Sequence, residues 1–319
     1  RVCKTIGSKK INMKKFFIFL IVTSGIPVFS LACDICGCGA GNNYIGILPE
    51  FRKQVFGVRY RYNTLHSHVG INGSSTYLTT KENYRIMEAW GGWNIRKNIR
   101  IMASIPYNFN NRINQGITKT KTGLGDISIW GYYQLINKKK TVFKSKLLVQ
   151  TLWAGAGIKL PTGKYNPSDK NNGTSDVNLF QLGTGSFDFN TSLMYDVRLQ
   201  DVGINLTANY KINTTNKYDY RYGSKLNLNT QLYYKFNIKN KIVLAPNAGI
   251  QYEYSDNDTD KAFSVAVSGG KLVSGMAGME IAYKKIAAGF NFQTALSQQL
   301  AMGIVKAGNR FMIHCAFAL

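Results

Sequence analysis

The chain has 319 residues, of which 45% are hydrophobic, and it carries a formal net charge of +24. This length allows one large domain or two modest ones. The basic residues are spread along the whole chain instead of being gathered in one patch, which disfavours nucleic-acid binding, although a soluble, basic, nucleic-acid-binding β protein is one competing interpretation.

The N-terminal segment MKKFFIFLIVTSGIPVFSLA (residues 13–32) is typical of a secretory signal peptide. Two lysines precede an apolar run, and a small-x-small cleavage site ends at Ala32. Residues 1–12 are expected to be an upstream extension. A membrane anchor is the alternative, but Gly25 and Pro27 would break its helix, and no run of about 18 apolar residues follows Ala32.

The next segment, residues 33–53, begins with CDICGCG, so that Cys33, Cys36 and Cys38 form a C-x2-C-x-C pattern. Behind a signal peptide these thiols enter the periplasm, an oxidising compartment. They could form a disulfide, hold copper(I) or zinc(II) as thiolate ligands, or, in the case of Cys33, carry a lipid. All three interpretations stay open. We expect this head to form a periplasmic cap or plug, which could also contact a periplasmic partner.

From residue 54 onward the sequence consists of long runs in which apolar and polar residues alternate. In VGINLTANYKI (202–212), valine, isoleucine, leucine, alanine and tyrosine occupy one face, and glycine, asparagine, threonine and lysine the other. A period of two indicates β-strands whose two faces meet different surroundings. The predicted strands are 54–64, 82–95, 99–110, 123–137, 144–160, 183–197, 202–213, 223–237, 241–255, 270–284, 286–298 and 307–319.

The connections between these strands alternate in length. Most short ones are turns such as RKN and RLQD, and the long ones are 65–81, 111–122, 161–182, 214–222, 256–269 and 299–306. Strands of about ten residues can cross a bilayer when tilted. An even strand number with short turns on one side and long loops on the other is typical of outer-membrane barrels.

The predicted fold class is therefore all-β. Residues 54–319 are expected to form a transmembrane, antiparallel, up-and-down β-barrel of about twelve strands, which the last segment closes by pairing with the first. The predicted location is the outer membrane of a Gram-negative cell, because a closed barrel satisfies every backbone polar group inside a bilayer.

Two segments resemble a known family. TGLGDISIWGYYQL (122–135) and GIKLPTGKYNP…LGTGSFDF (157–189) are similar to the Gly-x-Gly-Asp strand and the Leu-Pro-Thr-Gly loop of the MetA-pathway phenol-degradation family of outer-membrane transporters. The resemblance covers roughly residues 55–319 and implies a barrel similar to the fatty-acid and aromatic-hydrocarbon channels. The CDICGCG head resembles a Bacteroidetes-type subgroup of transporters and departs from the phenol-linked members.

The polar face of each strand is expected to line the barrel interior. Basic residues outnumber acidic ones there, and rings of basic residues favour anions in a pore. A lumen whose charges are packed and paired is the alternative. The residues predicted to line the lumen are Arg59, Arg61, Arg100, Lys211, Lys225, Lys235, Glu88, Asp126 and Asp188, with Asp196 and Glu253 beside them.

Candidate metal ligands outside the cysteine head are few. His66 and His68 form an H-x-H pair after the first strand, where two neutral imidazoles could share an ion or could simply be solvated. His314 lies within the last strand without a hydrolase motif around it. Because a Ser–His mechanism needs a placed histidine, we expect no enzymatic activity.

Together these features predict an outer-membrane channel for small solutes, either linked to copper or zinc through the head or passing small hydrophobic molecules. The expected partners are outer-membrane lipid, lipopolysaccharide and the solute, and nucleic acid is not among them. A structural or adhesive barrel with no conducting lumen, acting through its long loops, is the competing interpretation.

Overall fold

The structure is a computed structural model that describes residues 54–70, 73–142, 145–169 and 178–319. The predicted signal peptide and cysteine head lie outside these residues, so the predicted domain boundaries stay predictions. The described chain consists mainly of β-strands, with short 3-10 helices at Pro167–Asp169 and Ala301–Gly303. No helix in the described ranges is long and apolar enough to cross a membrane.

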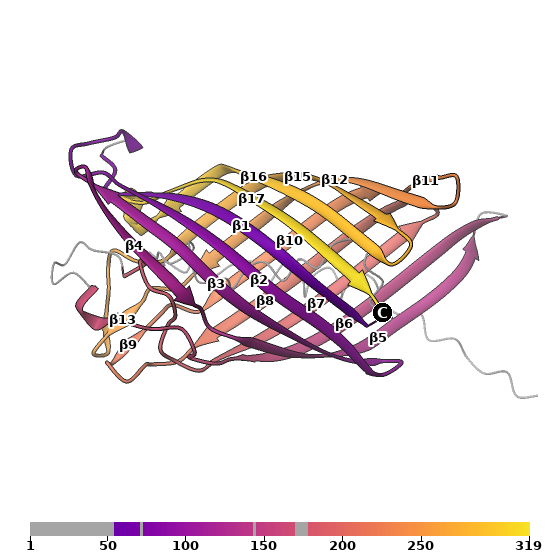
Figure 1. Cartoon of the computed structure of the whole chain (residues 1–319), viewed down its shortest axis with the longest axis horizontal. Helices are drawn as coiled ribbons and strands as arrows, with labels where there is room; N and C mark the ends of the chain where they lie inside the picture. Colours follow the sequence, from indigo (N-terminus) through magenta and orange to yellow (C-terminus); the bar gives the residue numbers. More distant parts are fainter. Residues whose placement is uncertain (1–53, 71–72, 143–144, 170–177) are drawn as a thin grey trace, which may run out of the picture. The chain divides into compact units, whose positions relative to one another are not determined.

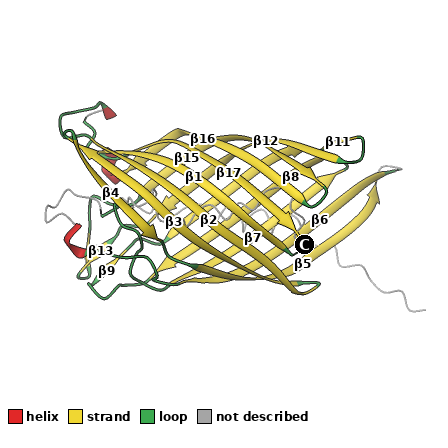
Figure 2. Cartoon of the chain, in the orientation of Figure 1, coloured by secondary structure: helices red, strands yellow, loops and turns green. Residues whose placement is uncertain are grey.

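The strands form a closed antiparallel barrel (Figures 1 and 2). Its sheet has fourteen strands, but β4 and β5 share one position beside β3, and β10 and β11 share one beside β12, which leaves twelve positions. Around the ring they are β1 (Val55–Ser67), β2 (Thr80–Arg96), β3 (Ile99–Asn114), β4 (Ile117–Leu124) with β5 (Ser128–Val142), β6 (Lys146–Lys159), β7 (Asp188–Leu199), β8 (Val202–Asn213), β10 (Lys225–Tyr234) with β11 (Phe236–Ile238), β12 (Ile242–Ser255), β15 (Gly270–Tyr283), β16 (Ile286–Leu300) and β17 (Lys306–Ala318).

The barrel is closed by the first and last strands. β1 pairs antiparallel with β17, from Val55 opposite Ala318 to His66 opposite Lys306. A second, small sheet of β9 (Tyr220–Arg221), β13 (Thr259–Asp260) and β14 (Phe263–Ser264) lies among the long loops. The predicted twelve-stranded fold, closed by the last strand, is confirmed.

The alternation of the sequence maps onto the two surfaces of the barrel wall. On β8, Val202 and Ile204 are exposed on the outside, whereas Gly203, Asn209 and Lys211 are buried inside. An apolar outside and a polar inside reverse the arrangement of a soluble protein, and they match a wall that is surrounded by lipid. The fold therefore places the protein in an outer membrane.

The two ends of the barrel differ, and we name them by their connections. The short-turn end carries the turns after β2, β5, β7, β11 and β15 together with the start of β1 and the end of β17. The long-loop end carries the connections 68–79, 160–187, 214–224, 256–269 and 301–305. By the rule for such barrels, the short turns face the periplasm and the long loops the cell exterior.

One predicted loop is a β-hairpin. Residues 111–122 were expected to be a loop, but β3 continues to Asn114 and pairs with β4 through a turn at Gln115 and Gly116, both of which have positive φ. The hairpin is rich in asparagine, threonine and lysine and is largely exposed. It has no apolar face, so the period of two that reveals the other strands is missing there.

Candidate functional site

The middle of the barrel lumen holds a cluster of buried charges. Arg59 of β1 donates two hydrogen bonds to Glu88 of β2, from Nη2 at 2.7 Å and from Nε at 3.2 Å. Nη2 of Arg61 lies 3.0 Å from the same carboxylate. Two buried guanidinium groups thus share one carboxylate, and this part of the lumen wall keeps a net positive charge.

A second ion pair spans the lumen between strands that are not neighbours. Nη1 of Arg310 on β17 lies 2.9 and 2.8 Å from the two carboxylate oxygens of Glu253 on β12, although β15 and β16 separate these strands in the wall. Asn227 and Gln251 donate to the same carboxylate at 3.3 and 2.7 Å. These side chains fill the interior and leave less room for a solute.

Toward the short-turn end the lumen wall becomes apolar. Three of the four tryptophans of the chain, Trp90, Trp130 and Trp153, are buried there in one cluster with Tyr132. The other members are Val55, Met102, Met194 and Ala316. A small hollow with a cavity volume of about 20 Å³, open in part, is lined by Trp90, Trp130, Tyr132, Met102, Ala103, Ser104 and Arg59. We call the four buried aromatic residues Trp90, Trp130, Tyr132 and Trp153 the lumen aromatic cluster.

Glycines on neighbouring strands make room for the rings of this cluster. Trp130 is paired with Gly157 across β5 and β6, and a Cβ atom on that glycine would lie 2.7 Å from the indole ring. Trp90 stands in the same relation to Gly57, with 2.8 Å to the ring. Because these glycines have no side chain, the rings can lie against the wall instead of standing in the lumen.

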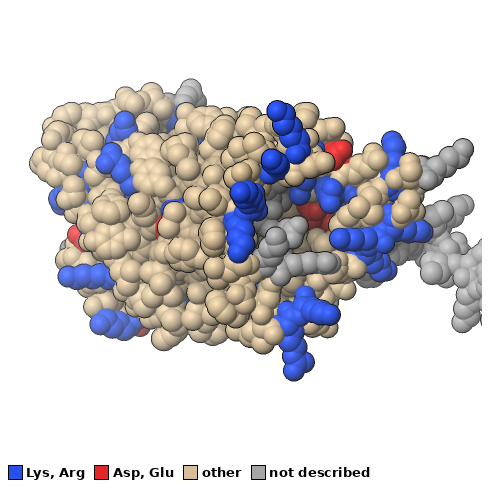
Figure 3. Space-filling model, turned by 45° about the vertical axis from the view of Figure 1, so that its right-hand side comes forward, with Lys and Arg blue, Asp and Glu red and all other residues tan. Residues whose placement is uncertain are grey.

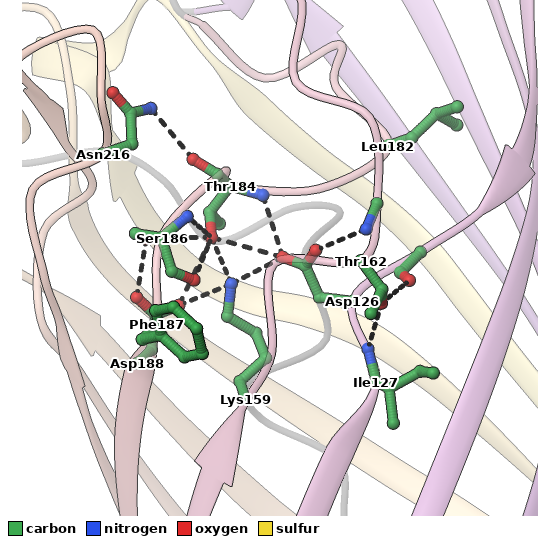
Figure 4. A network of polar contacts seen from close by, with 12 residues as sticks. Asp126, Ile127, Lys159, Thr162, Leu182, Thr184, Ser186, Phe187, Asp188 and Asn216 are labelled. Carbon is green, nitrogen blue, oxygen red and sulfur yellow. Dashed lines mark hydrogen bonds and ion pairs between the residues drawn. The ribbon is translucent and has the colours of Figure 1, made fainter.

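At the long-loop end a polar network joins three chain segments (Figure 4). Nζ of Lys159, the last residue of β6, lies 2.5 Å from Asp126 and 2.7 Å from Asp188. Lys211 of β8 adds a third contact, 3.1 Å from Asp188. The backbone N–H of Thr184 donates to Asp126 at 2.9 Å, and Lys159 also contacts the Thr184 hydroxyl. We call this group the lysine–aspartate network.

The network unites the segments GLGD, KLPTG and LGTGSFD. The backbone N–H of Gly163 donates to Asp126 at 2.9 Å, and Thr162 bridges the Gly125 carbonyl and the Ile127 N–H at 2.8 and 2.9 Å. A Cβ on Gly163 would lie 2.8 Å from the Cα of Gly183. These short motifs therefore belong together in space: the glycines permit close backbone approach, and the aspartate receives the backbone donors.

The connection between β6 and β7 has a described part that contacts the far wall of the barrel. It leaves β6 and returns to β7, yet Leu179 is buried in an apolar cluster with Leu65 of β1, Tyr84 of β2 and Leu272 of β15. In the ring of strands these lie on the far side from β6 and β7. The chain around Leu179 therefore reaches across the lumen, and we call the described parts of this connection, residues 160–169 and 178–187, the crossing loop.

Two further groups of contacts hold the crossing loop. The ring of Phe180 lies beneath Arg112 of β3 and Lys121 of β4, 4.7 and 5.0 Å from its centroid, and Lys121 donates to the Phe180 carbonyl. Lys121 also pairs with Asp169 of the same loop at 2.6 Å. Cation–π contacts and an ion pair thus fasten the loop to the β3–β4 hairpin.

On the other side the loop packs on a group of tyrosines. Asn178 donates to the phenol oxygen of Tyr165 at 2.8 Å, and Tyr222 donates to the Asn178 carbonyl at 3.1 Å. The ring of Tyr165 stacks on Tyr218 with 5.5 Å between centroids. Burial raises the pKa of the Tyr165 phenol above its usual range.

The family described as "Putative MetA-pathway of phenol degradation" matches residues 55–293, well over half of the chain. The chain belongs to this family. The family predicted from the GLGD and LPTG segments is thereby confirmed.

A solved structure has the same architecture as this family member. The COG4313 outer membrane channel from Pseudomonas putida F1 superposes with a TM-score of 0.58 at 12% sequence identity, covering 84% of this chain and 95% of that one. The beta domain of the Bordetella autotransporter BrkA gives a TM-score of 0.44 at 11% identity, covering 84% and 100%. No curated protein matches the sequence. At such identities the first likeness shows the fold alone.

The structure places the predicted lumen residues in different settings. Arg59, Arg61, Glu88, Arg100, Asp188 and Lys211 are buried inside the barrel. Lys225 is half-buried at the start of β10, opposite Lys211, and Lys235 is half-buried at the short-turn rim, 5.4 Å from the ring of Tyr233. Asp126 lies between β4 and β5, with its carboxylate in the lysine–aspartate network. Several of these charges face opposite charges, as the paired-lumen interpretation expects.

The two predicted histidine ligands, His66 and His68, do not form a metal site with other described residues. His66 stands on β1 between Lys306 of β17 and Lys81 of β2, and two lysines disfavour a cation there. His68 follows the strand with a positive φ. In residues 54–319, as far as they are described, no three His, Cys, Asp or Glu side chains come together. Cys33, Cys36 and Cys38 lie outside the described residues, and their metal, disulfide or lipid chemistry stays a prediction.

The inward side of β6 could not be assigned from the sequence. Because β6 is apolar on both faces, the alternation could not identify its inward side, yet Trp153 and Lys159 both point inward and are buried. A signal was present: Gly155 and Gly157 stand two apart, opposite Tyr132 and Trp130 of β5. Glycines at a spacing of two, facing aromatic residues at the same spacing, indicate which face holds the rings.

Proposed function

We propose that this barrel is a channel for small organic solutes with an apolar, preferably aromatic, part. The observation that carries the proposal is the lumen aromatic cluster. A lumen that served only water and ions would not need three tryptophans on its inner face, since interiors of such barrels are ordinarily polar. Binding sites for small molecules combine apolar and aromatic walls with a few polar groups.

The polar groups needed for recognition stand beside the rings. Arg59 and Ser104 line the same hollow as Trp90 and Trp130. The indole N–H of Trp90 is buried and has no hydrogen-bond partner among the described residues. A solute whose ring lies on the tryptophans could accept a hydrogen bond from this group or from the guanidinium. Phenols and aromatic acids have this combination of surfaces.

The crossing loop would act as the gate of this channel. It reaches over the mouth at the long-loop end, and its contacts are of two kinds: apolar contacts around Leu179 on the far wall and the polar lysine–aspartate network at its base. We propose that the far contacts open while the base stays in place. The loop then swings aside without unfolding.

We propose no catalytic role, because the fold resembles that of the COG4313 outer membrane channel. The competing function is a structural or adhesive barrel. It would be favoured if the lumen passed nothing even with the crossing loop released.

The test uses the full chain reconstituted in liposomes and planar bilayers. Leu179→Ala should raise ion conductance and the rate of liposome swelling in small solutes, because it removes the far anchor of the crossing loop. Leu78→Ala is the matched control, since this leucine lies at the same end and is 58% exposed. If neither the natural chain nor the Leu179→Ala variant conducts, the structural or adhesive function is supported instead.

A second pair of variants tests the solute class. Trp130→Ala should slow the uptake of benzyl alcohol relative to that of a polyol of similar size, because it removes a ring from the lumen aromatic cluster. Trp93→Ala changes the same residue type on the lipid side of β2, where the ring is 57% exposed. Equal effects of both variants would contradict the proposed aromatic route.

A further inference from the structure

The short-turn end of the barrel carries a strong excess of positive charge (Figure 3). Its basic residues are Arg96, Lys97, Lys138, Lys139, Lys140, Lys146, Arg198, Lys235, Lys239, Lys241, Lys284 and Lys285. In the described parts of these turns Asp201 is the single acidic residue. We call this set the basic rim.

The opposite end has no such excess. The described residues of the long-loop connections and of the stretch 111–127 contain seven basic side chains and six acidic ones. The basic ones are Arg112, Lys119, Lys121, Lys164, Lys217, Arg221 and Lys261, and the acidic ones are Asp126, Asp169, Asp219, Asp256, Asp258 and Asp260. The charge excess is therefore a property of one end of the molecule and does not follow from the basic composition alone.

The basic rim stands at the border of the lipid-facing surface. The ammonium of Lys284 lies 5.2 Å from the ring of Tyr283, and that of Lys285 lies 6.0 Å from the ring of Phe317. Both rings are more than 40% exposed on the outside of the barrel. Lys239 follows directly on the exposed Ile238 of β11. Lysines with their stems along apolar surface and their charges at its edge reach the headgroup level of a membrane.

We propose that the basic rim binds anionic phospholipid headgroups in the membrane leaflet at the short-turn end, in preference to zwitterionic ones. The lysines next to lipid-facing rings stand where the phosphate groups of that leaflet lie. An anionic leaflet attracts basic residues near its surface, and the attraction adds up over a cluster. The rim thereby determines which lipids surround this end of the barrel.

An acidic periplasmic protein is the other partner that positive charge could attract. The β5–β6 hairpin supplies part of the rim: β5 pairs with β3 only as far as Tyr133 and then continues beside β6 to Val142. Outside this hairpin the rim includes Lys284 and Lys285. The aromatic neighbours of the latter two favour lipid, and the test separates the two partners.

The experiment measures lipid retained by the purified full-length chain after extraction from bilayers of equal parts phosphatidylcholine and phosphatidylglycerol. Native mass spectrometry counts each lipid per barrel. The natural chain should retain several-fold more phosphatidylglycerol than phosphatidylcholine. Replacing Lys239, Lys241, Lys284 and Lys285 by Gln should reduce that ratio toward one.

The matched control replaces Lys119, Lys164, Lys217 and Lys261 by Gln, which removes the same charge from exposed positions at the long-loop end. This control should keep the lipid preference of the natural chain. A natural chain without preference, or an equal loss in both variants, would overturn the proposal. A heat-dependent gel shift verifies that each barrel is folded.

Discussion

The indole ring of Trp130 on β5 lies against Gly157 on β6, its direct cross-strand neighbour, so closely that a single added methyl group would overlap the ring. The same relation joins Trp90 to Gly57. The aromatic wall of the lumen thus depends on residues that carry no side chain at all. Adding a side chain at either glycine would therefore displace the neighbouring indole ring.

The first prediction concerns this pair. Gly157→Ala should destabilise the barrel by about 1–3 kcal/mol, because the new Cβ would lie 2.7 Å from both the Trp130 ring and the Ile129 carbonyl. Gly131→Ala on β5 is the control: its nearest neighbour, the Ala156 carbonyl, is 3.9 Å away. Urea-induced unfolding of both variants in lipid measures the difference. Equal stability of the two would show that the ring moves aside without cost.

The second prediction concerns the lysine–aspartate network. Lys159→Met should lower the free energy of unfolding by about 3–5 kcal/mol, because it leaves the buried carboxylates of Asp126 and Asp188 without their shared cation. Lys119→Met, at an exposed position on β4, should have an effect below about 0.5 kcal/mol. The midpoint of the heat-dependent gel shift reports both. A Lys159→Met barrel as stable as the control would mean that Lys211 alone neutralises the site.

The third prediction concerns ion selectivity. Glu88→Gln leaves the guanidiniums of Arg59 and Arg61 without their carboxylate, so the lumen should favour chloride over potassium by about fivefold more than before, as expected for ~1 kcal/mol per unit charge near 4 Å in water. The reversal potential in a potassium chloride gradient measures this, in a Leu179→Ala background so that the mouth is open. Glu82→Gln removes a carboxylate beside Arg112 at the long-loop end, so it tests whether the effect on selectivity depends on the position of the lost charge. An unchanged reversal potential would place the ion route away from Arg59.

The fourth prediction concerns pH. Burial raises the pKa of the Tyr165 phenol, so above about pH 10, where a free tyrosine titrates, the folded loop binds more protons than the unfolded chain. The stability that this hydroxyl contributes is fully present below pH 10 and is lost as the pH rises through the folded pKa. Chymotrypsin should cleave the crossing loop faster in that range. Tyr165→Phe, which has no phenol to ionise, should show a weaker dependence on pH.

The fold could be predicted from sequence because the bilayer imposes a local rule on it. Each membrane-spanning strand has to alternate apolar and polar residues, and the run 202–212 does so along its whole length. Strands outside the membrane do not need to alternate apolar and polar residues. For this reason the sequence predicts a loop where the structure has the β3–β4 hairpin.

The site was harder to predict, for three physical reasons. The inward side of β6 became clear only from its register with β5, which pairs Gly157 with Trp130. The course of the crossing loop depends on contacts between residues distant in sequence, such as Leu179 with Leu272, and no local pattern encodes them. Most of the predicted lumen charges lie on strands, but Asp126 and Lys235 lie between them, and partners such as Arg310 for Glu253 depend on the curvature of the whole barrel.

The pairing of β1 with β17 has a consequence for how the molecule is made. Val55 and Ala318 are neighbours in the wall but are separated by almost the whole barrel sequence. Contacts between such distant residues form late in folding, after the entropy of closing a very long loop has been lost. Until β17 is inserted, β1 and β16 present two open edges, each able to pair with a foreign strand. The unfinished barrel is therefore the species that the cell must keep from aggregating during assembly.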